Sequence, residues 1–147
     1  MSRAIDRKLR DLVAVRANFV CEYCLLAESD AFFRFQVEHI ISRKHGGMTT
    51  EENLAFSCVF CNLHKGTDIA SILPGKEGLV RLFDPRKDRW SSHFEIDGMM
   101  IRALTDIGEA TVRILKLNHP DRIIERQTLS EQGRYPSEEA LAYITEH

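Results

Sequence analysis

The sequence predicts an α+β fold for the 147-residue chain, which we expect to form a single domain over residues 1–147. In the middle of the chain, residues 31–41 and 53–57 favour β-strands and residues 59–67 favour a short helix. Further on, Asp97-Gly98 lies between two apolar runs and is a strong signal for a β-hairpin. Because 44% of the residues are hydrophobic, a chain of this length can bury a core of its own.

An N-terminal helix is expected over residues 3–16. Ile5, Leu9 and Val13 recur at helical spacing, and Ser2 can cap the start of this helix. The segment carries five basic and two acidic residues, so its outer face is positive. Such a face is usually only solvated, and contact with phosphates is the functional alternative.

The middle of the chain is expected to form strand, loop, strand and helix. The first strand is rich in aromatic and branched side chains, which favour β-structure. Residues 42–47 then form a basic loop, in which Gly46 and Gly47 allow the backbone to turn sharply. The second strand follows directly, and the helix after it is expected to end at Gly66.

The C-terminal part is expected to add a hairpin and a helix to this core. Residues 74–92 are irregular, and the strands of the hairpin follow on each side of Asp97-Gly98. The run from Asp106 to Glu109 resembles a capping box that begins a helix through Leu117, and Pro120 ends that helix.

Three segments can therefore be distinguished within the single domain. They are a core at residues 18–68, an extension at 74–120 and an acidic tail at 121–147. The tail holds three basic and six acidic residues, and Ser137 can cap a terminal helix within it.

The four cysteines predict a structural zinc site. They form two C-x-x-C pairs, and each pair can point both of its sulfurs at one ion: Cys21, Cys24, Cys58 and Cys61. Four thiolates complete a tetrahedral shell and leave no position for a substrate, so this zinc would tie the two pairs together and stabilise the fold. A redox protein is the alternative, but a thioredoxin-like site needs only one such pair.

The composition excludes a transmembrane helix, because no run of about 18 apolar residues occurs. The charged start of the chain has no apolar signal core, so we expect a cytoplasmic protein. The net charge of −2 provides no global basic field. Any contact with a nucleic acid must therefore come from a local patch.

Four polar residues between and beside the cysteine pairs suit the hydrolysis of a phosphodiester: Glu38, His39, Asn53 and Asn62. An imidazole can activate water near neutral pH, which predicts His39 as the general base. A carboxylate and an amide oxygen are ligands that Mg²⁺ accepts, which predicts Glu38 and Asn62 as ligands of a catalytic cation. Asn53 would hold the intervening loop with its amide. Glu38 and His39 should lie on opposite faces of their strand, with Asn62 brought back towards it by the helix.

The run VEHIISRKHGG-x-x-T-x-x-NL-x-x-x-C-x-x-CN-x-x-KG, preceded by C-x-x-C, resembles the HNH endonuclease family. Within that family it is similar to the subset with zinc knuckles, and residues 82–118 resemble an extension found in some bacterial members. The resemblance implies a ββα-metal fold and a nuclease that acts on DNA with Mg²⁺ or Mn²⁺. It implies that His39 is the base, Glu38 and Asn62 the metal ligands and Asn53 the orienting residue. It also implies 5′-phosphate and 3′-hydroxyl products.

Two positions depart from the usual pattern of the family. Glu38 stands where the acid is most often Asp, and its extra methylene can shift the metal slightly. Asn62 stands where many members have His, which should favour Mg²⁺ or Mn²⁺ over softer ions.

The expected partner is DNA, cut with low intrinsic specificity, and RNA stays open as a substrate. A homodimer would allow both strands to be cut, whereas a monomer would nick. The alternative function is a non-catalytic zinc module that binds a nucleic acid or a protein. Such a module predicts degenerate catalytic positions, and all four positions here are chemically competent.

Several other basic residues have both a functional and a structural interpretation. Arg43, Lys44 and Lys65 could neutralise phosphates beside the cation, and exposed, solvated charge is the equal alternative. Residues 81–90 mix basic and aromatic side chains that could grip DNA, although core packing of Trp90 is favoured. His64 could contact a phosphate from the other side of its helix, and His45 would be a motif residue only in a shifted register. His93 and His119 are expected to be structural or at the surface.

Overall fold

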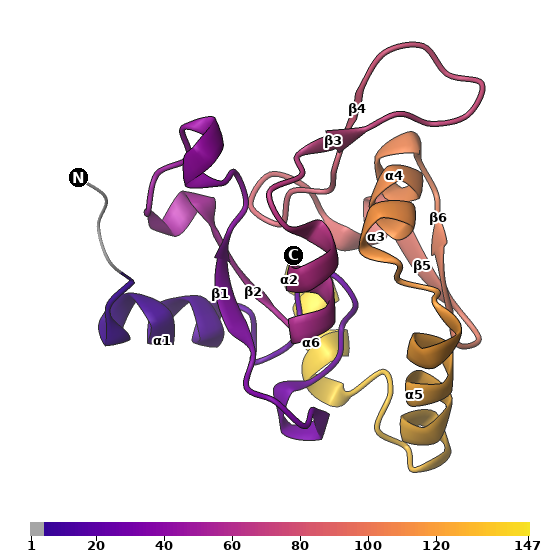
Figure 1. Cartoon of the computed structure of the whole chain (residues 1–147). Coiled ribbons are helices and arrows are strands. Elements are labelled where there is room, and N and C mark those ends of the chain that lie inside the picture. The colour runs from indigo at the N-terminus through magenta and orange to yellow at the C-terminus, as the bar shows by residue number, and fades with distance from the viewer. Residues whose placement is uncertain (1–4) are drawn as a thin grey trace.

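The computed structural model describes residues 5–147, over which the chain forms small antiparallel sheets surrounded by helices (Figure 1). The α+β class is confirmed. The helices are α1 (Arg7–Arg16), α2 (Val59–Lys65), α3 (Trp90–His93), α4 (Asp106–Leu115), α5 (Pro120–Glu131) and α6 (Glu138–Glu146). The strands pair as β1 (Gln36–His39) with β2 (Leu54–Ser57), β3 (Ala70–Ser71) with β4 (Val80–Arg81), and β5 (Phe94–Asp97) with β6 (Met100–Ala103).

The predicted strand, loop, strand and helix are present as β1, β2 and α2, which lie together in Figure 1. The strands are antiparallel, with Gln36 opposite Ser57 and His39 opposite Leu54. Cys58 caps α2 by accepting a hydrogen bond from the Cys61 backbone N–H at 3.4 Å, and Gly66 ends the helix as predicted. This arrangement places the end of β1 beside α2.

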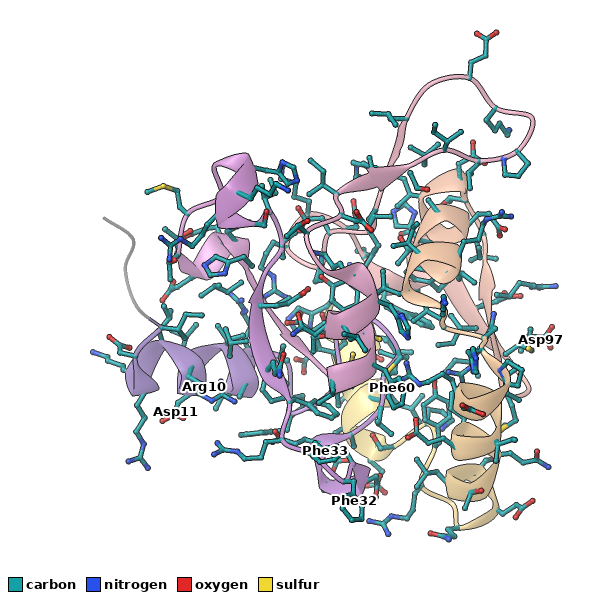
Figure 2. All side chains as sticks on the ribbon, viewed as in Figure 1. Arg10, Asp11, Phe32, Phe33, Phe60 and Asp97 are labelled. Carbon is teal, nitrogen blue, oxygen red and sulfur yellow. The ribbon has the colours of Figure 1, made fainter. Side chains whose placement is uncertain are left out.

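The first strand is shorter than its composition predicts. Residues 31–35 form bends rather than a strand, and Phe32 and Phe33 are 97% and 66% exposed (Figure 2). The Phe35 N–H donates to the Glu28 carboxylate at 2.8 Å instead of to a neighbouring strand. A segment rich in aromatic residues forms a strand only where a neighbouring strand can pair with it. β2 is only four residues long and pairs with Gln36–His39, so it does not reach residues 31–35.

The N-terminal helix begins at Arg7 rather than at residue 3. Its cap is Asp6, whose carboxylate accepts a hydrogen bond from the Leu9 N–H at 2.8 Å. Ser2, the cap expected from the sequence, lies outside the described residues. Leu9 and Val13 are buried against the strands as predicted. On the basic side, Arg16 donates to the Leu54 carbonyl at 2.7 Å, so part of the positive face serves packing.

The C-terminal hairpin is present, but its two-residue turn is Gly98-Met99, because Asp97 pairs with Met100. Gly98 has φ +62°, a conformation that favours glycine. The cap of α4 is Thr105, whose hydroxyl accepts from the Gly108 N–H at 3.0 Å, one residue before the expected Asp106. Pro120 is the first residue of α5, where its fixed φ suits a helix start.

Residues 121–147 are folded into α5 and α6 and belong to the main hydrophobic cluster. Arg122, Arg126 and Tyr143 of these helices are all buried, and Ser137 caps α6 as predicted. The acidic side chains of this segment lie mostly outside, which explains why its composition resembles that of a tail. No helix in residues 5–147 is both long and apolar enough to cross a membrane.

Candidate functional site

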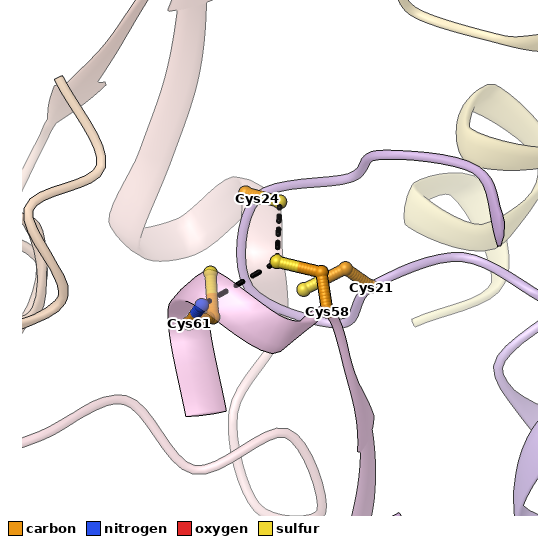
Figure 3. A group of neighbouring side chains, drawn as sticks. All are labelled: Cys21, Cys24, Cys58 and Cys61. Carbon is orange, nitrogen blue, oxygen red and sulfur yellow. Dashed lines mark hydrogen bonds between the residues drawn. The ribbon is translucent and has the colours of Figure 1, made fainter. Parts of the chain in front are cut away.

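The four cysteines form one buried cluster (Figure 3). All four sulfurs lie within 4.8 Å of one another, and those of Cys24 and Cys58 are 3.7 Å apart. Zn–S bonds of about 2.3 Å in a tetrahedron place sulfurs about 3.8 Å apart, so the cluster fits a zinc ion. Since four thiolates fill the shell, such an ion is structural. Both C-x-x-C pairs are used in this single cluster, which leaves neither of them for a separate redox site.

The first knuckle, residues 21–24, is surrounded by side chains from the C-terminal half of the chain. The indole N–H of Trp90 donates to the Tyr23 carbonyl at 2.9 Å, and the Tyr135 hydroxyl donates to the Cys24 carbonyl at 2.9 Å. Buried carbonyl groups need such donors, because an unpaired polar group inside a core is costly. The knuckle and the C-terminal segments therefore form one packed unit.

Glu22, between the two cysteines of that knuckle, is a fully buried carboxylate. It accepts hydrogen bonds from the Phe56 N–H at 2.9 Å and the Tyr143 hydroxyl at 2.6 Å, and it pairs with Arg86. Burial, reinforced by the Glu22 charge and hydrogen bond, raises the pKa of Tyr143 well above its ordinary value, so this hydroxyl stays a donor. The role of Glu22 is not predictable from the sequence, because its partners are distant in the chain.

A second site lies at the end of β1, where Glu38, His39 and Asn62 line one open pocket of about 380 Å³. Arg43 and Lys44 line the same pocket and are exposed, so they present positive charge at its rim. Three of the four polar residues selected from the sequence thus come together. The fourth, Asn53, does not line the pocket; its side chain bonds to the loop between β1 and β2.

His39 lies on the pocket side of β1, with its ring held by Thr49. The His39 Nε2 is 2.8 Å from the Thr49 hydroxyl, so Nδ1 is the ring nitrogen that is not bonded to Thr49. Partial burial, together with the positive charges of Arg43 and Lys65, lowers the pKa of His39. The imidazole is therefore neutral at neutral pH, as a general base requires.

Glu38, the neighbour of His39 on β1, lines the same pocket and is buried. The Tyr23 hydroxyl donates to its carboxylate at 2.5 Å, and the Lys65 ammonium lies 3.8 Å away. Burial raises the pKa of Glu38 to about 7, against the opposing effects of Lys65 and Tyr23. Tyr23 was not predicted as a partner, although it lies within the first C-x-x-C pair.

Asn62 faces β1 from α2, as the sequence predicts. Its amide N–H donates to the side chain of Gln36 at the start of β1. Its oxygen, the atom that can bind a hard cation, receives no hydrogen bond from the described residues. Glu38 and Asn62 thus bring a carboxylate and an amide oxygen, donor types that Mg²⁺ accepts, to one pocket.

Asn53 holds the loop between β1 and β2 with three hydrogen bonds. Its Oδ1 accepts from the Ile41 N–H at 2.9 Å, and its Nδ2 donates to the carbonyls of Ile41 at 2.9 Å and Met48 at 2.8 Å. Gly47 lies so close that a Cβ there would be 1.7 Å from the Ile41 carbonyl oxygen. The backbone beside His39 is therefore fixed by Asn53 and Gly47 together.

We expect Asn53→Ala to lower the rate of nucleic-acid cleavage by at least about tenfold, because His39 would lose its fixed backbone. Asn118→Ala is a matched control, since Asn118 makes the same pair of bonds to Ile101 in the extension, at 2.9 and 2.8 Å. Both variants should lose a few kcal/mol of stability in urea unfolding, but only Asn53→Ala should lose activity. Equal activity of the two variants would contradict this role.

Lys65 is only 2% exposed, so both alternatives offered for it, a phosphate contact and an exposed solvated charge, are wrong. Its ammonium donates to the Ile40 carbonyl at 2.9 Å and the His39 carbonyl at 3.3 Å. A flexible, exposed lysine is the usual case, but here α2 packs against β1 and leaves Lys65 no path to solvent. It therefore supports the strand that carries His39.

The aromatic side chains of the mixed basic and aromatic segment 81–90 belong to the core. Phe83 and Trp90 are buried, as the favoured interpretation predicts. Arg81 forms two hydrogen bonds with Asp88, at 2.7 and 2.8 Å, and Arg86 pairs with Glu22. These two arginines are thus paired with carboxylates of the protein, whereas Lys87 and Arg89 of the segment are exposed.

Four other histidines do not line the pocket at the end of β1. His64 stacks on Phe60 beside a separate pocket formed with α5, and His45 is exposed in the basic loop. His93 contacts the Thr105 hydroxyl at 2.6 Å, and His119 caps α5. His93 and His119 thus have the structural roles expected of them.

Comparison with known proteins identifies the segment that holds both sites. The HNH endonuclease family model matches residues 21–68, which contain both knuckles, β1, β2 and α2. No match was found among curated proteins or among solved structures. Residues 21–68 therefore match the HNH endonuclease family, and their cysteine cluster is consistent with its zinc-knuckle subset.

Proposed function

We propose that this protein is a metal-dependent endonuclease that hydrolyses phosphodiester bonds of DNA. The observation that carries the proposal is the convergence of Glu38, His39 and Asn62 on one open pocket, within the segment that matches the HNH endonuclease family. A base and two oxygen donors around a basic pocket suit attack of water on a phosphodiester.

His39 would act as the general base. Thr49 binds its Nε2, so Nδ1 is the nitrogen that takes a proton from the attacking water. The lowered pKa keeps the ring neutral and ready to accept that proton. Lys65 and Asn53 hold the backbone on either side of the strand end, which fixes the position of the imidazole.

Glu38 and Asn62 would hold the catalytic cation. A carboxylate and an amide oxygen are hard donors that suit Mg²⁺ or Mn²⁺, and two protein ligands leave room for water and phosphate. When bound, such an ion supplies positive charge to the leaving oxygen and the non-bridging oxygens. Tyr23 and Lys65 fix the orientation of the Glu38 carboxylate.

DNA is the proposed substrate, bound through its phosphates by Arg43 and Lys44 at the rim of the pocket. Phosphate contacts carry no sequence information, so we expect low sequence specificity. The buried free thiols of the cysteine cluster suit a reducing compartment such as the cytoplasm.

The test is cleavage of supercoiled plasmid by the zinc-loaded protein, with Mg²⁺, with Mn²⁺ and with neither. We expect nicked or linear DNA only when one of these ions is added, and the ratio of the two products reports whether a homodimer cuts both strands. Glu38→Gln should lower the rate by at least about tenfold through loss of a metal ligand. The matched control Glu52→Gln changes an exposed carboxylate and should cleave like the wild type.

Single-stranded DNA and RNA serve as parallel substrates. Faster cleavage of RNA than of DNA would change the proposed substrate. A folded, zinc-loaded protein that cuts none of the three with either ion would overturn the proposal. It would then favour the alternative of a non-catalytic zinc module.

A further inference from the structure

Arg122 of α5 lies directly against the cysteine cluster, although about 60 residues separate it from the second knuckle. Its guanidinium donates to the Cys24 sulfur at 3.0 Å, and its nitrogens lie 3.6 Å from the Cys58 sulfur and 3.8 Å from the Cys61 sulfur. One side chain thus reaches three of the four candidate zinc ligands. These contacts join the C-terminal segment to the metal site.

The position of Arg122 is unfavourable unless a negative partner is present. The side chain is only 3% exposed, so its charge has lost almost all of its water. It also lies in the first turn of α5, where the helix dipole disfavours a cation. A carboxylate, Glu125, is 3.6 Å away on the outer side of α5. The sulfurs are the closest groups that can compensate the charge.

The second knuckle itself orients the guanidinium. The Arg122 Cζ lies 5.1 Å from the centre of the Phe60 ring, and Phe60 is one of the two residues between Cys58 and Cys61. A cation over an aromatic face is attracted by the ring, which limits the directions that the planar group can take. The N–H groups of the planar Arg122 guanidinium therefore point at the sulfurs.

We propose that Arg122 is an outer-sphere partner of the metal ion at the four-cysteine site, and that α5 is therefore part of the metal centre. Four thiolates and one Zn²⁺ carry a net charge of −2, buried in a hydrophobic cluster. Arg122 halves that charge and donates hydrogen bonds to the thiolates, which stabilises the metal-bound form. This proposal concerns metal retention and is independent of the proposed nuclease activity.

The test compares two buried arginines of the same helix. Arg126 is 2% exposed and bonds to the Met99 carbonyl at 2.8 Å and to Asn118 at 3.0 Å, without contact to a sulfur. Arg122→Met and Arg126→Met therefore remove the same group from similar burial. Zinc affinity of each full-length chain is measured by competition with a chromophoric chelator. Arg122→Met should bind zinc 10- to 100-fold more weakly, roughly the effect of losing an outer-shell partner, and Arg126→Met should stay close to the wild type.

A spectroscopic measurement separates an effect on the thiolates from a general loss of structure. In the Co²⁺-loaded protein, the sulfur-to-cobalt charge-transfer band should move to lower energy in Arg122→Met, because the thiolate electrons lose a stabilising positive charge. The band should not move in Arg126→Met. Equal zinc affinities for the two variants, or an unchanged band in Arg122→Met, would overturn the proposal.

If Arg122→Met does not fold, the same test is made with Arg122→Lys, and Arg126→Lys is its control. Lysine keeps the charge but lacks the planar fork, so it cannot donate to three sulfurs at once. We expect a loss of zinc affinity of about threefold or more for Arg122→Lys only, together with a band shift in the same direction. Wild-type affinity and an unshifted band in Arg122→Lys would overturn the proposal.

Discussion

His39→Ala is expected to lower the single-turnover rate of plasmid cleavage by about 10²- to 10⁴-fold, the usual contribution of a general base. The reason is geometric and electrostatic. The ring lines the open pocket, Thr49 fixes its Nε2, and burial with nearby positive charge keeps it neutral. The measurement is the rate of loss of supercoiled DNA with protein in excess, with equal zinc content in the two samples.

His45→Ala is the matched control, because His45 is an exposed histidine of the basic loop at residues 42–47 and does not line the pocket. It should cleave at the wild-type rate. The pH dependence offers a further check on the wild type. The base and the carboxylate ligand must both be unprotonated, so the rate should rise with pH through the ionisation of His39, whose pKa lies below the usual 6.5, and that of Glu38, whose pKa is about 7, and then level off. A His39→Ala protein that retains activity within a few-fold of wild type would show that another group is the base.

Removal of the metal from the cysteine cluster is expected to unfold the chain. Structural zinc contributes on the order of 10 kcal/mol to the folding of small zinc-binding units, which is comparable to the whole stability of a typical domain. The cluster ties residues 21–24 to residues 58–61, and the pocket that holds His39 is lined by residues within 37–44, between the two pairs, and by Asn62, Gly66 and Thr67, which follow the second pair. Cys58→Ser should therefore abolish cooperative thermal unfolding followed by circular dichroism, and with it any cleavage.

Ser57→Ala provides the control for this prediction. Ser57 is the buried neighbour of Cys58, and its hydroxyl makes a single hydrogen bond at 3.1 Å to the Cys58 carbonyl. We expect a loss of only about 1 kcal/mol and a retained cooperative transition. In the wild type, chelation should remove the transition and added zinc should restore it. A metal-free chain that unfolds cooperatively near the wild-type temperature would contradict the structural role of the cluster.

The elements of the core were predictable because their signals are local. The spacing of the cysteines, the Gly66 helix end and the paired amide of Asn53 each depend on residues close in the chain. Boundaries that depend on neighbours were less predictable. The stretch before β1 has the composition of a strand but no partner to pair with, and the first helix begins where Asp6 can cap it.

The sequence by itself determined the metal site, the strand–loop–strand–helix segment that holds His39 and Asn62, and the resemblance to the HNH endonuclease family. These features are encoded in short motifs whose spacing limits their geometry. Only the tertiary structure decided that Lys65 is buried beneath β1, that Glu22 joins α6 to the first knuckle, and that Arg122 reaches the cysteines. From the sequence alone, a charged side chain is expected to be exposed unless its partner is known. Those partners lie 25 to 121 residues away, where only packing of the whole chain brings them together.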